Sequence, residues 1–333
     1  MAFGRVVRLF VGNFALGNMD TKDAKRIDGL DIEFSVTRSI EFWDNAATIT
    51  LYNPSPDTLR YVMRTGASVI LQAGHEDETV GNIFVGQIAR VETHREGPDI
   101  VTAMTCKSAR GAYYQLVKLS CDVRFRKGAT FRECLQYMAD YAGVALRAGA
   151  DLDALDGALS RNFQASGSFP GVFENFVRTV LKPEAKLGAF YDNNEILILG
   201  ENKHVEIEHI ALYYDTGLLS ASEIRDEGDN DINGGGDAYH MMAGIPELEK
   251  KYRLDEHAPK VQEVDRKRRV RFRAILSPKF CPNARVELDS TTGDSYDSVL
   301  AVQGLFSIDS VEFNGGTTGS DFTVECEAVE VTE

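Results

Sequence analysis

The sequence predicts a mainly β, α+β protein in which two related β-domains flank a smaller α/β middle domain. Three observations support this prediction. Most patterned segments alternate apolar and polar residues, which is typical of strands with one buried face. Residues 111–200 instead contain apolar stripes at helical spacing. A strand pattern from the first third of the chain also returns in the last third. Because 333 residues exceed a typical single domain, two or three compact units are expected.

The first domain, residues 1–110, is expected to be a small barrel or sandwich that carries one helix. Apolar residues alternate with polar ones around Phe34 and again around Ile49, which predicts two strands. A short helix is predicted over residues 57–63, ending before Gly66. Further strands are predicted from residue 69, over residues 83–91 and over residues 100–107.

The middle domain contains two predicted helices. Thr130 and Glu133 form a T-x-x-E capping box at the start of the first helix, and Gly143 stands where a C-cap belongs. The second helix begins near Ser168 and is expected to end at Pro183, because proline has no N–H to continue the helix. A β-hairpin follows this helix.

The third domain, residues 201–333, is expected to return to strands after an irregular insertion at about residues 220–265. The acidic, glycine-rich start of that insertion favours a loop, and its later part is compatible with helix. Strands are predicted over residues 270–275, 285–288, 305–311 and 322–328. The predicted boundaries are therefore 1–110, 111–200 and 201–333.

A repeat links the first and third domains. From Val91 to Cys106 the offset to the later copy is a constant 220 residues, so that Val91 corresponds to Val311 and Cys106 to Cys326. Alternation alone can align strands with strands, so duplication and chance are both open at this point. If the repeat is real, three chains would give a ring of six similar units.

Several segments together resemble the phage baseplate hub family, whose relatives include late-control proteins and the N-terminal part of type VI secretion spikes. The resemblance covers most of the chain and depends on the order and spacing of short segments. They are residues 45–53 (NAATITLYN), 83–91 (IFVGQIARV), 191–199 (YDNNEILIL), 216–219 (TGLL) and 270–278 (VRFRAILSP).

The resemblance implies a structural protein of a contractile phage tail, a homotrimer with two tube-like β-barrel domains per chain. Such a pseudo-hexameric ring joins the tail tube protein to the central spike protein around an axial channel, with wedge or tape-measure proteins as further partners. It implies a place in the virion baseplate after assembly in the host cytoplasm. The chain departs from the family at the insertion and at Asn283, which replaces the glycine of a Pro-Gly turn.

A dense basic run enters the first predicted strand of the third domain. We consider three roles for it: a contact with an acidic face of a neighbouring subunit, a contact with DNA in the channel, or a solvated strand face. The acidic composition of the third domain favours the first role. The candidate intersubunit residues are Arg266, Arg268, Arg269, Arg271 and Arg273.

The net charge of −15 argues against nucleic-acid binding, and its excess of acid lies almost wholly in residues 201–333. Affinity for nucleic acids comes from Lys and Arg that neutralise phosphates, so specific DNA or RNA binding is not expected. No run of 18 apolar residues occurs, so no membrane span is predicted.

Neither catalysis nor a bound cofactor is expected. The sequence contains no HExxH, G-x-S-x-G or P-loop motif. Asp229 to Gly234 copies the opening of a calcium loop, but His240 stands where the bidentate glutamate is required, so no metal is predicted. The five cysteines lie far apart and are expected to be buried thiols.

Three other functions stay open as alternatives to the hub. A cell-wall-degrading tail enzyme needs only two well-placed carboxylates, which 51 acidic residues could supply. A spike component of a secretion machine has a similar shape class. A monomeric ligand-binding β-protein would require a pocket that the sequence does not indicate.

Overall fold

The computed structural model describes the greater part of the chain. The described residues are 4–12, 24–40, 45–108, 120–148, 153–193, 195–200, 210–224, 267–291, 301–319 and 321–331. Residues 225–266 fall outside them, so the structure does not test the calcium-like loop, Arg266 or most of the predicted insertion.

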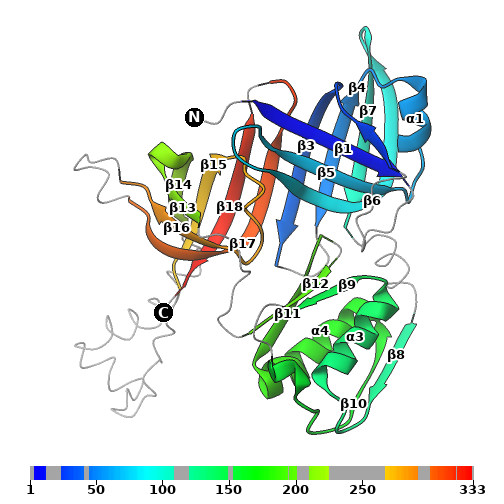
Figure 1. The fold of residues 1–333 in the computed structure, drawn as a ribbon, viewed down its shortest axis with the longest axis vertical. Helices are drawn as coiled ribbons and strands as arrows, with labels where there is room; N and C mark the ends of the chain where they lie inside the picture. Colours follow the sequence, from blue (N-terminus) through cyan, green and yellow to red (C-terminus); the bar gives the residue numbers. More distant parts are fainter. Residues whose placement is uncertain are drawn as a thin grey trace, which may run out of the picture.

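One large sheet of thirteen strands dominates the fold (Figure 1). The strands before the middle domain are β1 (Arg5–Gly12), β2 (Lys25–Ile27), β3 (Asp31–Ser39), β4 (Ala46–Tyr52), β5 (Ser68–His75), β6 (Val80–Glu96) and β7 (Asp99–Lys107). Those after it are β13 (Ile210–Tyr213), β14 (Leu218–Ile224), β15 (Arg269–Ile275), β16 (Arg285–Asp289), β17 (Gln303–Gly316) and β18 (Phe322–Glu330). The predicted mainly β fold is therefore confirmed.

The strands pair in the order β14-β15-β18-β17-β3-β4-β7-β6-β5-β1-β2, and β16 and β13 branch from β17. All pairs in this sheet are antiparallel except β13 with β16. Because β17 of the third domain pairs with β3 of the first, the two β-domains share one sheet. Among the described strands, this sheet is open, with β14 at one edge and β2 at the other. No closed barrel is therefore present among them.

Strict alternation places one face of the large sheet in the main hydrophobic core. In β3, for example, Ile32, Phe34 and Val36 are buried while Glu33 and Thr37 are exposed. Equivalent inward residues of the other strands form one cluster that extends through both β-domains. The opposite face of β3, β4, β7, β15, β17 and β18 carries mainly polar side chains.

The short helix α1 (Pro56–Val62) lies within a residue of its predicted bounds. The side chain of Ser55 accepts a hydrogen bond from the N–H of Thr58, and Pro56 opens the helix where its missing N–H costs nothing.

The middle domain has a hydrophobic core of its own and lies beside the β3–β7 part of the large sheet (Figure 1). Its helical elements are α3 (Phe131–Ala142), η1 (Asp153–Asp156), α4 (Phe169–Phe176) and η2 (Val177–Ala185). Its strands are β8 (Ser120–Phe125), β9 (Ala145–Ala148), β10 (Phe163–Ser168), β11 (Leu187–Asp192) and β12 (Glu195–Gly200). Strands β8 and β10 form one small sheet, and β9, β12 and β11 form another.

The predicted capping box of α3 is present. The Thr130 side chain accepts from the N–H of Glu133, and the Glu133 carboxylate accepts from the N–H of Thr130 at 2.9 Å. The latter bond lowers the pKa of Glu133. Gly143 ends the helix with a φ of 66°, as the C-cap prediction requires.

The prediction that the second helix ends at Pro183 is wrong. The chain continues past this proline as the π-helix η2 and stops only at Lys186, which adopts a left-handed conformation. In an α-helix the N–H of residue 183 would bond to the carbonyl of Thr179, and proline cannot supply it. The guanidinium of Arg161 donates to that carbonyl instead, at 3.0 Å.

A 3-10 turn, η3 (Tyr214–Thr216), precedes β14. No helix within the described ranges has both the length and the apolar composition needed to cross a bilayer.

Candidate assembly interface

Two groups of five strands in the large sheet have the same order of antiparallel neighbours. The first repeat consists of β3-β4-β7-β6-β5, and the second repeat of β14-β15-β18-β17-β16. The next strand differs between them, because β1 is antiparallel to β5 whereas β13 is parallel to β16.

The same turn and the same bulge occur in both repeats. Gly66 and Asn283 occupy equivalent turn positions with φ values of 85° and 63°. The N–H of Gly66 donates to the carbonyl of Ile88 (2.8 Å), and the N–H of Ile88 donates to the carbonyl of Ala67 (2.9 Å). In the second repeat, the N–H of Asn283 donates to the carbonyl of Ile308 (2.7 Å), and the N–H of Ile308 donates to the carbonyl of Ala284 (3.0 Å). Directly after Ile88 and Ile308 the register shifts, as at a β-bulge.

The offset of 220 residues holds at the bulge but not along the whole predicted segment. Val91 pairs with Met104 in the first repeat, and Val311 pairs with Cys326 in the second. The pairing therefore makes Met104, and not Cys106, the counterpart of Cys326. The second hairpin is two residues longer, which sequence alternation conceals because a shift of two keeps each side chain on its face.

The two repeats are joined through β17 and β3. Seven residue pairs connect residues 310–316 to residues 33–39. Phe313 and Val311 on this part of β17 are fully or almost fully buried. Beyond the strand, the Thr317 hydroxyl donates to Asp31 at 2.8 Å and accepts from the N–H of Ile32 at 2.9 Å. This junction makes the two repeats one continuous surface within the chain.

The edges of the two repeats that lie away from their junction carry no strand partner among the described residues. Residues 90–96 of β6, here named the arm, extend beyond β5 and pair only with β7. Within the arm, Val91 is half-buried, and the side chains of residues 92–96 are exposed. Strand β14 ends the other side of the sheet and pairs only with β15.

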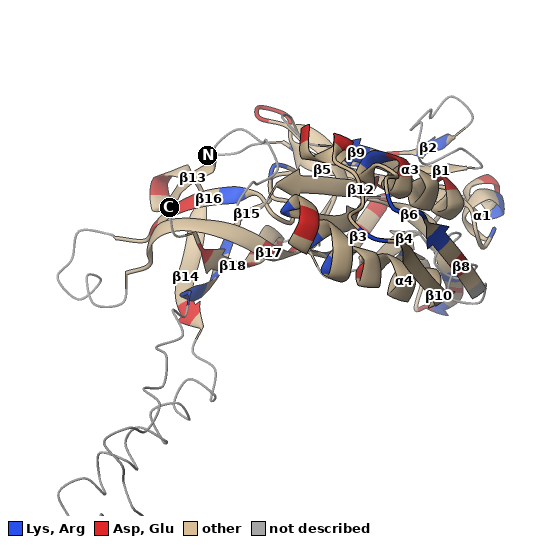
Figure 2. Cartoon of the chain, turned by 90° about the horizontal axis from the view of Figure 1, so that it is seen from below, with Lys and Arg blue, Asp and Glu red and all other residues tan. Residues whose placement is uncertain are grey.

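The predicted basic run lies on the polar face of β15, opposite acidic side chains of β18. Arg271 pairs directly with Glu327 across the ladder and contacts it at 2.5 Å. Hydrogen bonding to Glu327 raises the pKa of Arg271. Arg273 lies 3.4 Å from Asp321 and Arg269 lies 3.7 Å from Glu327. Figure 2 shows blue and red segments together around β14, β15 and β18.

These arginines therefore have carboxylate partners within their own chain. Arg268 also reaches two carboxylates, those of Glu223 at 3.5 Å and Glu330 at 3.4 Å. Exposed pairs of this kind are worth about 0–1 kcal/mol each, so the ladder is available for exchange with another charged surface. An intersubunit role for it stays a prediction, and Arg266 is not described.

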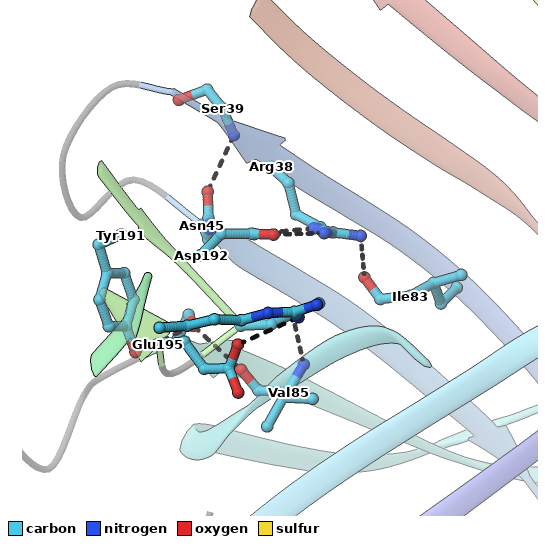
Figure 3. A network of polar contacts seen from close by, with 11 residues as sticks. Arg38, Ser39, Asn45, Ile83, Val85, Tyr191, Asp192 and Glu195 are labelled. Carbon is cyan, nitrogen blue, oxygen red and sulfur yellow. Dashed lines mark hydrogen bonds and ion pairs between the residues drawn. The ribbon is translucent and has the colours of Figure 1, made fainter. Parts of the chain in front are cut away.

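A buried polar network anchors the middle domain to the first repeat, and sequence reasoning did not find it (Figure 3). The guanidinium of Arg38 donates to both carboxylate oxygens of Asp192, at 3.0 and 2.5 Å. Asn45 donates to the same carboxylate at 3.0 Å. Burial lowers the pKa of Arg38, but the charge and hydrogen bonds of Asp192 outweigh burial and raise it overall.

The next residue in the hairpin extends this anchor. The side chain of Asn193 accepts from the N–H of Val85 at 3.0 Å, and the Ser108 hydroxyl donates to the carbonyl of Val85 at 3.0 Å. Arg38 and Asp192 are only 3% and 6% exposed, so their pairing is needed to offset the cost of burying both charges. The sequence does contain one signal, since Arg38 continues the inward phase of Ile32, Phe34 and Val36.

The described part of the chain can be compared with the sequence prediction that no metal is bound. Its His, Cys, Asp and Glu side chains form no cluster of three placed to hold a metal. All five cysteines are buried and free, and burial raises the pKa values of Cys106 and Cys281 to about 12. Such thiols stay protonated and unreactive.

Solved structures with the same fold are phage tail and secretion proteins. A 43 kDa tail protein of a Shewanella oneidensis prophage superimposes with a TM-score of 0.59 at 10% identity, covering 98% of both chains. A tail protein of Neisseria meningitidis gives 0.58 at 9% identity, covering 98% of this chain and 97% of its own.

A type VI secretion component of E. coli, described as similar to T4 bacteriophage tail proteins gp27 and gp5, gives a TM-score of 0.52 at 9% identity. That match covers 91% of this chain and 74% of the other. At these identities the likeness shows the fold alone. No curated protein sequence matched the chain.

The sequence itself matches a protein-family model described as "Baseplate hub gp41" over residues 49–229. This match covers more than half of the chain, from within β4 of the first repeat to five residues beyond β14. It agrees with the resemblance noted from short segments and with the folds of the structural neighbours. The protein therefore belongs to the phage baseplate hub family.

Proposed function

We propose that three copies of this chain form a ring of six similar strand units that joins the tail tube to the central spike around an axial channel. The observation that carries this proposal is the repeat: one strand order, one turn and one bulge occur twice per chain. Three chains then present six similar sectors, which would match a threefold spike to a sixfold tube.

In this ring the polar face of the large sheet lines the channel. The apolar face is already covered by the core, so the polar face is the surface that an open channel can use. On β15 and β18 its arginines lie opposite carboxylates, and on β3 and β4 its outward residues include Ser35, Thr37, Thr48 and Thr50. A wall of this kind would let DNA or a tape-measure protein pass without binding it tightly.

The proposed partners are further copies of the chain, the tail tube protein, the central spike protein, and wedge or tape-measure proteins. Assembly takes place in the host cytoplasm, and the ring ends in the virion baseplate. Each repeat acts as a tube-like sector of the wall, so the barrel closes between chains rather than within one. The role is structural and requires no cofactor, membrane contact or specific nucleic-acid binding.

The mass of the purified protein in solution tests the proposal, by light scattering over a concentration series with and without the cognate spike. A particle of about three times 36.8 kDa with a central hole on imaging is the expected result. A strict monomer under every condition, including with the spike, contradicts it.

The ladder on β15 is proposed to contribute to contacts between subunits. Reversing the charges of Arg269 and Arg271 should weaken assembly, because an acidic face of the neighbouring subunit would then meet like charges. The matched control reverses Glu327 as well, which restores opposite charges across the ladder. If assembly is unchanged in the reversed variant, the ladder has no part in subunit contact.

A further inference from the structure

A groove of about 600 Å³ lies between the middle domain and the second repeat. The middle domain supplies one wall from η2, β11 and β12, and β17 and β18 supply much of the other. Both walls include apolar side chains, with Leu187, Phe190 and Leu199 on the first and Val329 on the second. Ile40 also lines the groove and is 37% exposed, which leaves apolar surface in contact with solvent.

Three exposed lysines line the same groove. Lys182 and Lys186 come from η2 and its C-cap, and Lys267 lies shortly before β15. Their side chains form no ion pair with a described residue, whereas the arginines of the neighbouring ladder are all paired. Asp309 and Glu330 also line the groove, but Glu330 already has an arginine 3.4 Å away. The groove therefore holds an excess of positive charge in a chain whose net charge is −15.

The turn at Asn283 adds a hydrogen-bond donor to the groove. The Asn283 side-chain oxygen accepts from the Ser307 hydroxyl at 3.2 Å. Its amide nitrogen has no partner within the described ranges. Gly66 occupies the equivalent turn of the first repeat and offers no such side chain. The exchange of glycine for asparagine thus places a polar group where the second repeat borders the groove.

Strand β11 brings a free strand edge to the groove. It pairs with β12, and no other described strand pairs with it. Residues 187–190 of β11 line the groove, and a Cβ atom at Gly188 would meet nothing within 4 Å. An extended peptide beside an edge strand can bond to the main-chain groups of that strand. The shape of the groove therefore favours an extended occupant.

We propose that this groove binds an extended acidic segment of a partner protein, in which carboxylates alternate with apolar side chains. Successive side chains of a strand point to opposite sides, so one row can reach the lysines while the other packs on the apolar walls. The carboxylates pair with Lys182, Lys186 and Lys267. This binding site requires no ring of subunits and thus goes beyond the proposed function.

Two other occupants fit the groove less well. The chain has an acidic segment of its own, residues 226–237, but Ile232 is the one large apolar residue in it. Such a segment would match the lysines and leave most of the apolar wall uncovered. A nucleic acid would bring many phosphates close to a strongly acidic protein, which opposes binding.

Fluorescence anisotropy with short labelled peptides and the purified full-length chain tests the proposal. The probe is a peptide in which glutamate alternates with leucine, and it should bind saturably. A peptide with lysine in place of glutamate should not bind, because it would meet the lysines of the groove. A peptide with serine in place of leucine should bind about tenfold more weakly, since it buries no apolar side chain.

Charge reversal identifies the groove as the binding site. Lys182→Glu with Lys186→Glu should weaken binding of the glutamate–leucine peptide about tenfold or more, because like charges then meet. The matched control is Lys107→Glu with Lys127→Glu, which changes the net charge equally at exposed lysines outside the groove. It should bind like the unaltered protein. Ile40→Asp is a second test variant, which should weaken binding through the apolar wall.

Four results would overturn the proposal. They are the absence of saturable binding, equal losses in the test and control lysine variants, equal or tighter binding of a short single-stranded oligonucleotide, and a tenfold gain in peptide affinity on deletion of residues 226–237. The last result would make the chain's own acidic segment the occupant. The mass of the protein in solution tests the ring separately, so failure of one proposal is distinguishable from failure of the other.

Discussion

The first and second repeats share a backbone plan but differ in what they carry. Both contain the same turn, at Gly66 in the first repeat and at Asn283 in the second. Both also contain the same bulge, directly after Ile88 and Ile308 respectively. On the polar face, β3 and β4 of the first repeat carry several Ser and Thr residues, whereas β15 and β18 of the second carry an arginine and carboxylate ladder. Among the described residues, the first repeat alone carries a helix such as α1 and the buried anchor of the middle domain. Main-chain geometry is thus preserved where outward side chains diverge.

The largest expected difference between the repeats is at the junction positions. Phe313→Ala should lower the free energy of unfolding by about 4 kcal/mol, because it leaves a cavity at a fully buried site. Thr93→Ala at the equivalent arm position should change it by less than about 0.5 kcal/mol in the monomer. Urea unfolding at low protein concentration measures both. Similar losses for the two variants would mean that the arm is already covered in one chain.

A buried and an exposed arginine provide the next comparison. Arg38→Met should destabilise the protein by about 3 kcal/mol, since it leaves the Asp192 carboxylate buried without its cation. Arg271→Met, which removes an exposed pair, should cost less than about 1 kcal/mol. The same unfolding experiment compares them. The difference should survive high salt, which screens only the exposed pair.

The turn shared by the repeats predicts an unusual order of substitutions. Gly66→Ala should cost about 1–2 kcal/mol, because an alanine at a φ of 85° is strained although nothing lies within 4 Å of its Cβ. Gly66→Asn should cost less than about 0.5 kcal/mol, as Asn283 already occupies the equivalent position. Thermal unfolding distinguishes the two. Equal effects of Ala and Asn would contradict the equivalence of the turns.

The smallest expected effect concerns pH. By register, Asp289 is the counterpart of Gln72, and its carboxylate accepts hydrogen bonds from Thr291 and Gln303 that lower its pKa. The resulting stabilisation is present above the unfolded pKa, near 3.8, and is lost as pH falls through the lower folded value. Asp289→Asn should therefore lower the melting temperature slightly at pH 6 and hardly at all at pH 2. An equal loss at both pH values would rule out this carboxylate as the source.

Local signals predicted the secondary structure well. The capping box at Thr130, the C-cap at Gly143 and the alternation in β3, β4 and β6 all placed elements within a few residues. Each depends on chemistry within one turn or one strand. Pro183 was misleading because its effect depends on Arg161, a residue outside the helix that satisfies the orphaned carbonyl.

The candidate interface could be predicted only in part. The repeat was visible in sequence, but its offset failed beyond the hairpin because alternation does not detect a shift of two residues. Alternation shows that Arg38 points inward, but it cannot identify Asp192 as its partner 154 residues away. The open edges became recognisable only when β17 was seen to pair with β3, since sequence does not specify which strand lies beside which.

The β17 and β3 junction also sets an order of events during synthesis. The N–H of Ile32 bonds to a hydroxyl 285 residues further along the chain, so β3 is made long before the strand that covers it. Pairing at such a separation is slow, and until then β3 presents a bare edge. A nascent chain, or one truncated before β17, would therefore be the species most prone to aggregate.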